Sequence, residues 1–241
     1  PNGGLAVLGD FSGDVDVTQV AAWQKLPEAA LKKVSGSTAY TGKLSVNESQ
    51  DGQIDLVIDS GLLGVNINLP DPIGKNADDA KALRVKVMKH EKDIVIDANY
   101  AALYKVRFLL QDNEFAGGEV ILNGRKDQNL SANIPKGLVL MGYFDHFYVQ
   151  DWQSVFTDLS GDGSASSEGA EVPELPKWLS KVDLIVDKVV VDPSNTWHNF
   201  KVAYNSATNK SLFVSSDEMN FSLLSKDDGN PNLHFGFLSW N

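Results

Sequence analysis

The sequence predicts an all-β protein built on a long antiparallel sheet, with a few short helices. Apolar and polar residues alternate with period two over many short runs, which places apolar side chains on one face of each strand. Links rich in Gly, Asn, Asp and Pro separate these runs, and such links typically form turns. Because the links are short, we expect neighbouring runs to pair in sequence order as a meander.

The clearest alternation comprises residues 54–59 and 65–69. In the first run three aliphatic residues alternate with mostly polar neighbours, and the second run repeats the pattern. Pro70 and Pro72 then end any strand ladder, because proline has no backbone N–H to donate. This stretch therefore predicts two strands of a sheet that is apolar on one face.

The composition limits the partners and the chemistry of the chain. Its 241 residues, 42% of them hydrophobic, are enough for one large all-β domain or two smaller ones. The net charge of −11 opposes binding to nucleic acid and weakens adsorption to anionic membranes. The absence of cysteine excludes disulfides, zinc–thiolate sites and thiol catalysis. No run approaches the ~18 apolar residues that cross a bilayer.

The two ends of the sequence suggest that it belongs to a longer protein. The first residues read as if they began in the middle of a sheet, without a charged-then-apolar signal segment. We therefore expect any targeting signal to lie outside this sequence.

The N-terminal part predicts an edge strand followed by two short helices. Residues 5–17 alternate loosely and fit a short strand pair or a sheet edge. Residues 18–34 change to helical spacing, which Pro27 interrupts. We expect two helices that meet at this proline, with Pro27 in the first turn of the second helix. Ser35 and Gly36 are expected to end this segment.

Strand-like runs dominate the rest of the chain. They predict an antiparallel meander whose short turns connect sequence neighbours. The expected strands are 39–46, 54–59, 65–69, 82–89, 94–100, 103–111, 118–123, 138–144, 182–191, 197–204, 211–214, 219–224 and 233–238.

One helix and one linker are expected to interrupt the later strands. Residues 147–159 carry Trp152 and three other apolar residues on one side of a helix. Residues 160–172 are small, polar and acidic, as in a flexible linker. We expect one domain over residues 1–241, or two segments, 1–159 and 173–241, joined by this linker.

Motifs for catalysis, metal binding and nucleotide binding are absent. The four histidines are widely separated, and HExxH and GxSxG do not occur. Gly74 and Lys75 fail the phosphate-loop pattern because Leu69 and Asn76 occupy required positions. We therefore expect no catalytic residues, no metal and no cofactor, and we predict that the protein is not an enzyme.

What remains is a set of apolar residues that would share one face of the sheet. Such a face must be buried against a second sheet, a helix layer or a ligand. The pattern alone favours a closed β-sandwich over a curved open sheet whose trough holds acyl chains, and periodicity does not distinguish them. The residues expected to line this face are Ile54, Leu56, Ile58, Val65, Ile67, Leu69, Val85, Val87, Ile94, Ile96, Val106, Phe108, Leu110, Val120, Leu122, Leu138 and Leu140.

Two other functions remain open for a sheet of this kind. A carbohydrate-binding or adhesive β-sandwich would use Trp197, Trp240 or Tyr204 as stacking platforms, which requires exposed, coplanar rings. A purely structural spacer would have a packed interior and no groove.

The segment DSGLLGVNINLPDPIGKNADDAKALRV resembles a segment of the YhdP proteins, which are large AsmA-like proteins of Gram-negative bacteria. The family pattern Ser-Asp before the loop appears here as Asp59-Ser60. Residues 115–118 and 181–191 also occur in the family's order, so the resemblance covers most of the chain. The matching positions of the central segment are Asp59, Ser60, Gly61, Leu63, Gly64, Val65, Leu69, Pro70, Asp71, Pro72, Gly74, Lys75, Ala77 and Leu83.

This resemblance implies a long, strongly curved antiparallel sheet that forms a hydrophobic groove. Family members are anchored in the inner membrane, extend through the periplasm and carry phospholipid toward the outer membrane, which supports outer-membrane lipid homeostasis. The expected partners are phospholipid acyl chains, the rest of the same long chain, and proteins of the inner and outer membranes. The family offers no catalytic residues to carry over.

A groove of this kind has a simple physical role. Each CH₂ group kept from water contributes ~0.8 kcal/mol, so an acyl tail needs a lined path. Uniform Val, Ile and Leu walls create no deep well, and the lipid head group stays wet at the open side. We expect the helices that carry Trp23 and Trp152 to cover part of the exposed apolar rim.

Overall fold

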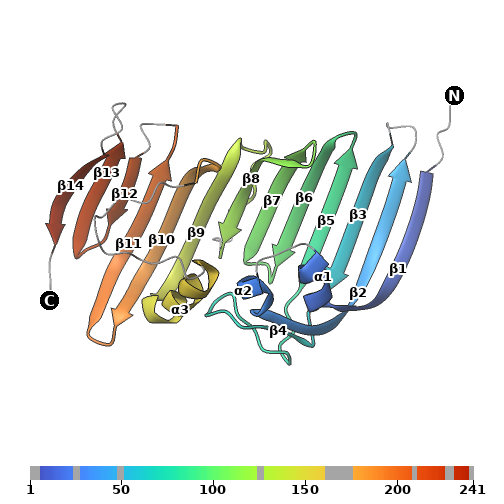
Figure 1. The fold of residues 1–241 in the computed structure, drawn as a ribbon, viewed down its shortest axis with the longest axis horizontal. Helices are drawn as coiled ribbons and strands as arrows, with labels where there is room; N and C mark the ends of the chain where they lie inside the picture. The colour runs from blue at the N-terminus through green and yellow to red at the C-terminus, as the bar shows by residue number, and fades with distance from the viewer. Residues whose placement is uncertain are drawn as a thin grey trace. The chain divides into compact units, whose positions relative to one another are not determined.

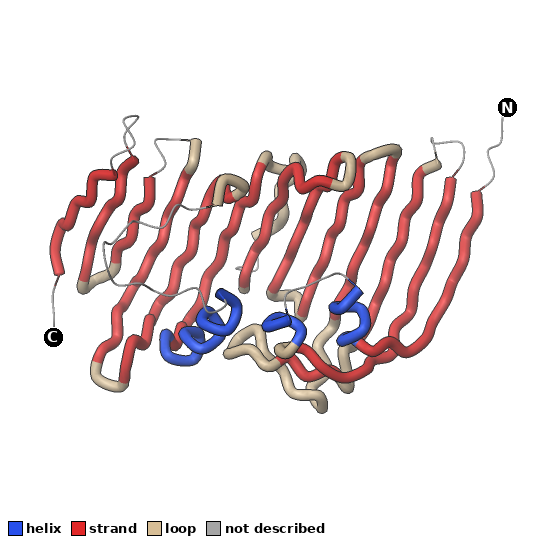
Figure 2. Tube along the Cα trace, viewed as in Figure 1, coloured by secondary structure: helices blue, strands red, loops and turns tan. Residues whose placement is uncertain are grey.

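The computed structural model is all-β with a few short helices (Figures 1 and 2). It describes residues 6–23, 28–47, 52–123, 128–160, 176–207, 211–225 and 231–238. The chain divides into two compact units, Pro1–Gly118 and Glu119–Asn241, which we call unit 1 and unit 2. No helix within the described residues is long and apolar enough to cross a membrane.

Unit 1 is an antiparallel meander, as predicted. Its strands pair in the order β1-β2-β3-β5-β6-β7, and β1 is an edge strand that pairs with β2. The strand β8 (Glu114–Leu122) crosses the boundary between the units. The bounds of the other strands are β1 Ala6–Asp16, β2 Val34–Asn47, β3 Gln53–Ser60, β5 Leu83–His90, β6 Asp93–Tyr100 and β7 Tyr104–Gln111.

The predicted strand 65–69 does not belong to this meander. Only residues 65–67 of it form a strand, β4 (Val65–Ile67), which pairs with the beginning of β2, while β3 pairs directly with β5. Two glycines allow this close approach, since a Cβ on Gly36 would lie 2.1 Å from the Gly64 oxygen. The expectation that Ser35 and Gly36 end the preceding segment is also wrong, because β2 begins at Val34. Alternation predicted a strand here but carries no information about its partner.

Two short helices follow β1, as predicted. They are α1 (Val17–Trp23) and α2 (Glu28–Leu31), and Pro27 lies outside the described residues. The Asp16 carboxylate accepts a hydrogen bond of 2.8 Å from the Thr18 backbone N–H, which satisfies a free donor at the start of α1. Both helices contact β2, and Figure 1 shows them in front of the strands of unit 1.

In the part of unit 2 that the structure describes, six strands and one helix follow the end of β8. The strands β9 to β14 pair in sequence order, and all pairs are antiparallel except β9 with β10, which is parallel. The prediction of a wholly antiparallel meander is therefore wrong at this pair, because a helix and a long connection form a crossover. The bounds are β9 Gly137–Tyr148, α3 Val149–Ser160, β10 Leu179–Asp192, β11 Asn195–Asn205, β12 Ser211–Ser215, β13 Met219–Ser225 and β14 Pro231–Leu238.

The predicted helix and linker match this part of the chain only in outline. The predicted helix 147–159 begins two residues later, since Phe147 and Tyr148 complete β9. The predicted linker 160–172 lies outside the described residues except for Ser160, the last residue of α3. The division into segments 1–159 and 173–241 also differs from the two units, whose boundary falls within β8.

Each unit is a single-layered sheet. Among the described residues, strands contact their neighbours and the three short helices, and no second sheet packs against either unit. All eight residues of β3 are half-exposed, as expected when neither face is sealed. The closed β-sandwich favoured by the alternation pattern alone is therefore wrong, and the open sheet implied by the family resemblance is confirmed.

Candidate functional site

The register of unit 1 brings apolar side chains together on one face. Leu56 of β3 lies opposite Val87 of β5, which lies opposite Ile96 of β6, which in turn lies opposite Phe108 of β7. Residues directly opposite one another point to the same side of a sheet. We call this surface the apolar face of unit 1. Its apolar residues on the paired strands include Val7, Phe11, Leu44, Val46, Ile54, Leu56, Ile58, Val85, Val87, Ile94, Ile96, Val106, Phe108 and Leu110.

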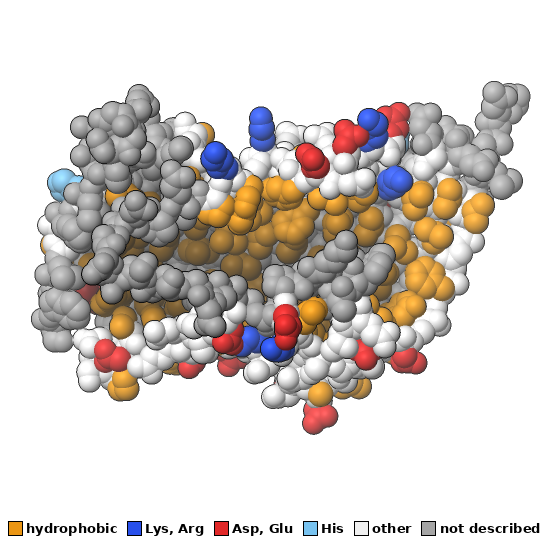
Figure 3. Space-filling view, in the orientation of Figure 1, with side chains coloured by type: hydrophobic (Ala, Val, Ile, Leu, Met, Phe, Trp, Pro, Cys, Tyr) orange, Lys and Arg blue, Asp and Glu red, His pale blue; other side chains and the backbone are white. Residues whose placement is uncertain are grey.

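The opposite side of the same sheet, its polar face, is lined by charged pairs. Arg107 binds Asp97 through two hydrogen bonds, of 2.7 and 2.9 Å. Arg84 lies 3.7 Å from Asp59, and Lys86 lies 4.0 Å from a carboxylate of β3. In Figure 3 hydrophobic side chains gather over the strands of unit 1, whereas charged side chains appear along the edges. The two faces therefore differ sharply in character.

Of the seventeen predicted lining residues, thirteen lie in unit 1, and the structure places ten of these on its apolar face and three elsewhere. Val65, Ile67 and Leu69 lie in the loop between β3 and β5, where Val65 is 1% exposed. The ten residues on the face are Ile54, Leu56, Ile58, Val85, Val87, Ile94, Ile96, Val106, Phe108 and Leu110.

Sequence reasoning missed the contribution of β1 and β2 to this face. Val7, Phe11, Leu44 and Val46 occupy positions in register with the predicted residues. The interruption at Gly42 hid the alternation in β2. The Phe11 ring fills the space beside this glycine, since a Cβ there would lie 2.1 Å from a Phe11 carbon. Counting apolar residues at alternate positions, with one glycine accepted among them, would have found these residues.

Unit 2 has an apolar face of its own. Leu140 of β9 lies opposite Val182 of β10, and the predicted Leu138 lies opposite Leu179. The predicted Leu122 packs beside Gly142, where an added Cβ would lie 3.1 Å from the Leu122 Cβ, and Val120 precedes it by two residues in β8. We define the apolar face of unit 2 by Val120, Leu122, Leu140, Phe144, Val182, Leu184, Val186, Phe200, Val202 and Val214.

In β9, β10 and β11 the alternation of buried and exposed side chains is interrupted once, at neighbouring positions of the three strands. Each of these strands has two consecutive exposed residues: Asp145-His146, Asp187-Lys188 and His198-Asn199. Apolar residues stand on both sides of each pair, so Val189 joins Phe144 and Val186 in one buried cluster. Strict alternation would have placed Val189 on the other side. The apolar region consequently continues along the strands toward α3.

The helix α3 covers this end of the apolar region. Its Trp152 ring stacks on Phe147 at 5.8 Å between ring centres, with 13° between the ring planes. Val155 of the same helix is 3% exposed, and α3 contacts β10. The helix that carries Trp152 was expected to cover part of the exposed apolar rim, and Trp152 lies at such a position. The side chain of Trp23, for which the same was expected, is not among those that the structure describes.

The loop between β3 and β5 closes one edge of unit 1 around a buried lysine. The Lys75 ammonium donates hydrogen bonds to the carbonyl oxygens of Leu62 (2.9 Å), Asn76 (2.8 Å) and Val65. Burial lowers the pKa of Lys75, and the nearby Asp79 carboxylate acts in the opposite direction. All three N–H groups serve the loop's own backbone, in which residues 71–73 form a turn and Lys75 pairs with Ile67 in an isolated β-bridge.

Gly74 and the loop's other contacts complete this closure. A Cβ on Gly74 would lie 2.0 Å from the Leu69 oxygen, so only glycine fits. The Lys81 backbone N–H donates to the Gly61 oxygen at 2.9 Å, which ties the two ends of the loop together. The Tyr100 hydroxyl donates to the Ile73 oxygen at 3.2 Å and attaches the loop to β6.

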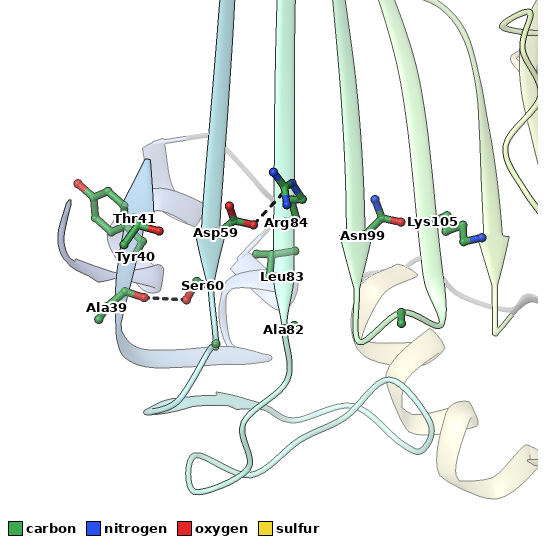
Figure 4. Close-up of a pocket in the computed structure, with 12 residues that line it drawn as sticks. Ala39, Tyr40, Thr41, Asp59, Ser60, Ala82, Leu83, Arg84, Asn99 and Lys105 are labelled. Atoms are coloured by element: carbon green, nitrogen blue, oxygen red, sulfur yellow. Dashed lines mark hydrogen bonds and ion pairs between the residues drawn. The ribbon is translucent and has the colours of Figure 1, made fainter. Parts of the chain in front are cut away.

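A hollow of about 920 Å³ lies near the loop end of the strands of unit 1 (Figure 4). It contains none of the predicted lining residues, and its charged residues belong to the polar face. Two pairs of its labelled residues bind each other, since Ser60 donates to the Ala39 oxygen at 2.8 Å and Arg84 lies 3.7 Å from Asp59. Within the described residues, no group of three His, Cys, Asp or Glu side chains could hold a metal ion.

The aromatic residues considered for carbohydrate stacking do not form exposed platforms. Tyr204 is only 7% exposed. Trp197 is half-buried and stacks on Phe200 at 5.9 Å between ring centres. Trp240 lies outside the described residues. This geometry gives no support to the carbohydrate-binding alternative, which requires exposed, coplanar rings.

Comparison with known proteins agrees with these features. The family model described as YhdP protein matches residues 2–237, nearly the whole chain. No curated protein and no solved structure matches the chain. The chain, with its open one-sided sheets and its LPDPIGK loop, belongs to the YhdP family.

Proposed function

We propose that this chain carries phospholipid by its acyl tails along the apolar faces of its sheets. The observation that carries the proposal is the row of aliphatic side chains that crosses neighbouring strands in register and remains half-exposed, without a second sheet over it. Exposed apolar surface of this extent typically marks a binding surface. Membership of the YhdP family, whose proteins are AsmA-like, supports a role in lipid transport.

The dimensions of unit 1 suit an acyl chain. Its six paired strands leave five intervals of about 4.8 Å, so the apolar face extends roughly 24 Å across the strands. A lipid tail spans ~15 Å, half the thickness of the hydrocarbon core of a bilayer. Each CH₂ group on this face would gain up to ~0.8 kcal/mol, and the uniform aliphatic lining provides no single deep site. An acyl tail would therefore bind to the face and still be able to slide along it.

The wider role that we propose follows the family. The chain would act in the periplasm as part of an inner-membrane-anchored protein that moves phospholipid between the inner and outer membranes. Its partners would be acyl chains, the remainder of the same protein, and proteins of the two membranes. No catalytic step and no cofactor enter this proposal.

The test compares two neighbouring residues on opposite faces of β6. Ile96 lies on the apolar face and Val95 on the polar face, and both are half-buried in the middle of the strand. We expect Ile96→Asp to remove most of the phospholipid that copurifies with the protein, because an acyl chain would have to cross a carboxylate. Val95→Asp should leave that phospholipid in place.

The measurement is mass spectrometry of lipid extracted from natively purified protein, with thermal unfolding recorded for each variant. The proposal fails if wild-type protein carries no phospholipid and takes up none from vesicles. It also fails if the two variants lose lipid equally at equal stability.

A further inference from the structure

The two edges of the apolar face of unit 1 are built differently. At one edge the loop between β3 and β5 lies beside the strand ends and is attached through Tyr100. At the other edge, β5 joins β6 and β7 joins β8 through two-residue turns, Glu91-Lys92 and Asp112-Asn113. A lipid whose tails lie on the apolar face therefore has its clearest exit to water at the edge with the short turns.

One charged side chain stands on the apolar face at this second edge. Lys89 of β5 lies opposite Ile54 of β3 and Ile94 of β6, which both belong to the face. At all the remaining positions of this face, the paired registers of β1, β2, β3, β5, β6 and β7 place apolar, glycine, serine or threonine residues. Lys89 is thus the exception to an otherwise uncharged surface.

The Lys89 ammonium is also available for a ligand. Lys89 is exposed, and it makes no hydrogen bond or ion pair with any part of the chain that the structure describes. The basic residues at comparable positions on the polar face behave differently. Arg84, Lys86 and Arg107 each face an aspartate across a strand. Lys89 therefore combines an ammonium without a carboxylate partner with a place on the apolar face, in a chain with a net charge of −11.

We propose that Lys89 binds the phosphate group of a phospholipid whose acyl tails lie on the apolar face of unit 1. The inference rests on the proposed function and specifies how the lipid is oriented. The aliphatic part of the lysine extends the apolar surface, while its ammonium reaches the water at the edge. The phosphate diester supplies the complementary charge, so the head group lies beside the turns while the tails lie on the apolar face.

The expected contribution is modest because the site is open to water. A lysine near an anionic lipid surface contributes ~1 kcal/mol, which corresponds to about fivefold in affinity. The tails supply most of the binding, so Lys89 should select for head-group chemistry and leave the binding of neutral lipid unchanged.

The experiment measures the binding of two lipids with identical acyl chains to the purified chain. Phosphatidylglycerol carries the phosphate and diacylglycerol lacks it. We expect Lys89→Gln to weaken phosphatidylglycerol binding about fivefold, Lys89→Glu to weaken it further, and Lys89→Arg to retain it. All four proteins should bind diacylglycerol equally. This equality shows that the variants are folded.

Lys43 provides the matched control. It is an exposed lysine on β2 whose register places it on the polar face. Lys43→Gln should leave the binding of both lipids unchanged. If Lys89→Gln and Lys43→Gln bind phosphatidylglycerol equally well, the assignment of Lys89 is wrong while the proposed function stands. If wild-type protein binds neither lipid, the proposed function itself fails.

A third arm separates a lipid head group from a soluble phosphate compound. Glycerol 3-phosphate has the charged group without the tails. At equal concentration it should not displace phosphatidylglycerol, because most of the affinity comes from the acyl chains. Displacement at that concentration would assign Lys89 to a soluble ligand and overturn the proposal.

Discussion

Replacing Lys75 with methionine tests whether the LPDPIGK loop depends on its buried ammonium. The substitution keeps much of the volume but removes the donors that serve the carbonyl oxygens of Leu62, Val65 and Asn76. Lys75 is 5% exposed, so water cannot readily replace these bonds. Loss of hydrogen bonds from a charged donor destabilises the variant by ~1.5–3 kcal/mol each. Because the variant no longer buries a charge, it regains several kcal/mol. We expect a net loss of about 3 kcal/mol.

Thermal and urea unfolding measure this loss, with Lys92→Met as the control. Lys92 pairs with Asp112 at 2.9 Å, but both side chains are more than two-thirds exposed, so its replacement should change the free energy of unfolding by less than ~1 kcal/mol. Lys75→Met should lower the unfolding midpoint by roughly 6–12 °C. If the two variants were equally stable, the buried lysine could not be what holds the loop together.

Two further predictions concern the backbone around the sheet of unit 1. Gly74→Ala should destabilise the protein by about 2–4 kcal/mol in urea unfolding, because its Cβ would meet the Leu69 oxygen at 2.0 Å. Gly61→Ala, where nothing lies within 4 Å, should be nearly neutral, and equal losses would contradict this account of the loop. Hydrogen bonds from Thr18 hold the pKa of Asp16 below its ordinary value of 3.8. The stabilisation of α1 by Asp16 should be complete above pH 3.8 and decline as pH falls through the lowered pKa. Amide exchange in α1 measures this decline as a loss of protection, and the loss should be absent in Asp16→Ala.

The positions and faces of most strands could be predicted from the sequence, because the cause is local. Alternation decides which side chains share a side of a strand, and polar turn residues decide where the strand ends. Ile94 and Ile96, for example, lie on the same face as Val106 and Phe108, as predicted. The registry of each hairpin then follows from its short turn.

The remaining features depend on contacts between distant residues. The pairing of β4 with β2 relies on the close approach of Gly36 and Gly64, which no periodicity reveals. The interrupted alternation near Asp187 and the parallel pairing of β9 with β10 likewise depend on how neighbouring strands and α3 pack. The role of Lys75 could not be predicted, because sequence alone does not show that three carbonyl groups converge on it.

The charged pairs of the polar face explain how unit 1 keeps its register without a second sheet. A slip of one residue would turn every apolar side chain to the opposite face, and a packed core normally prevents this. Here Asp97 lies directly opposite both Lys86 and Arg107, and Asp59 lies opposite Arg84. A slip would separate these charges, including the Arg107–Asp97 pair, whose side chains are only 25% and 18% exposed. Because the polar face specifies the register, the apolar face needs no second sheet over it and stays available for the lipid that we propose it binds.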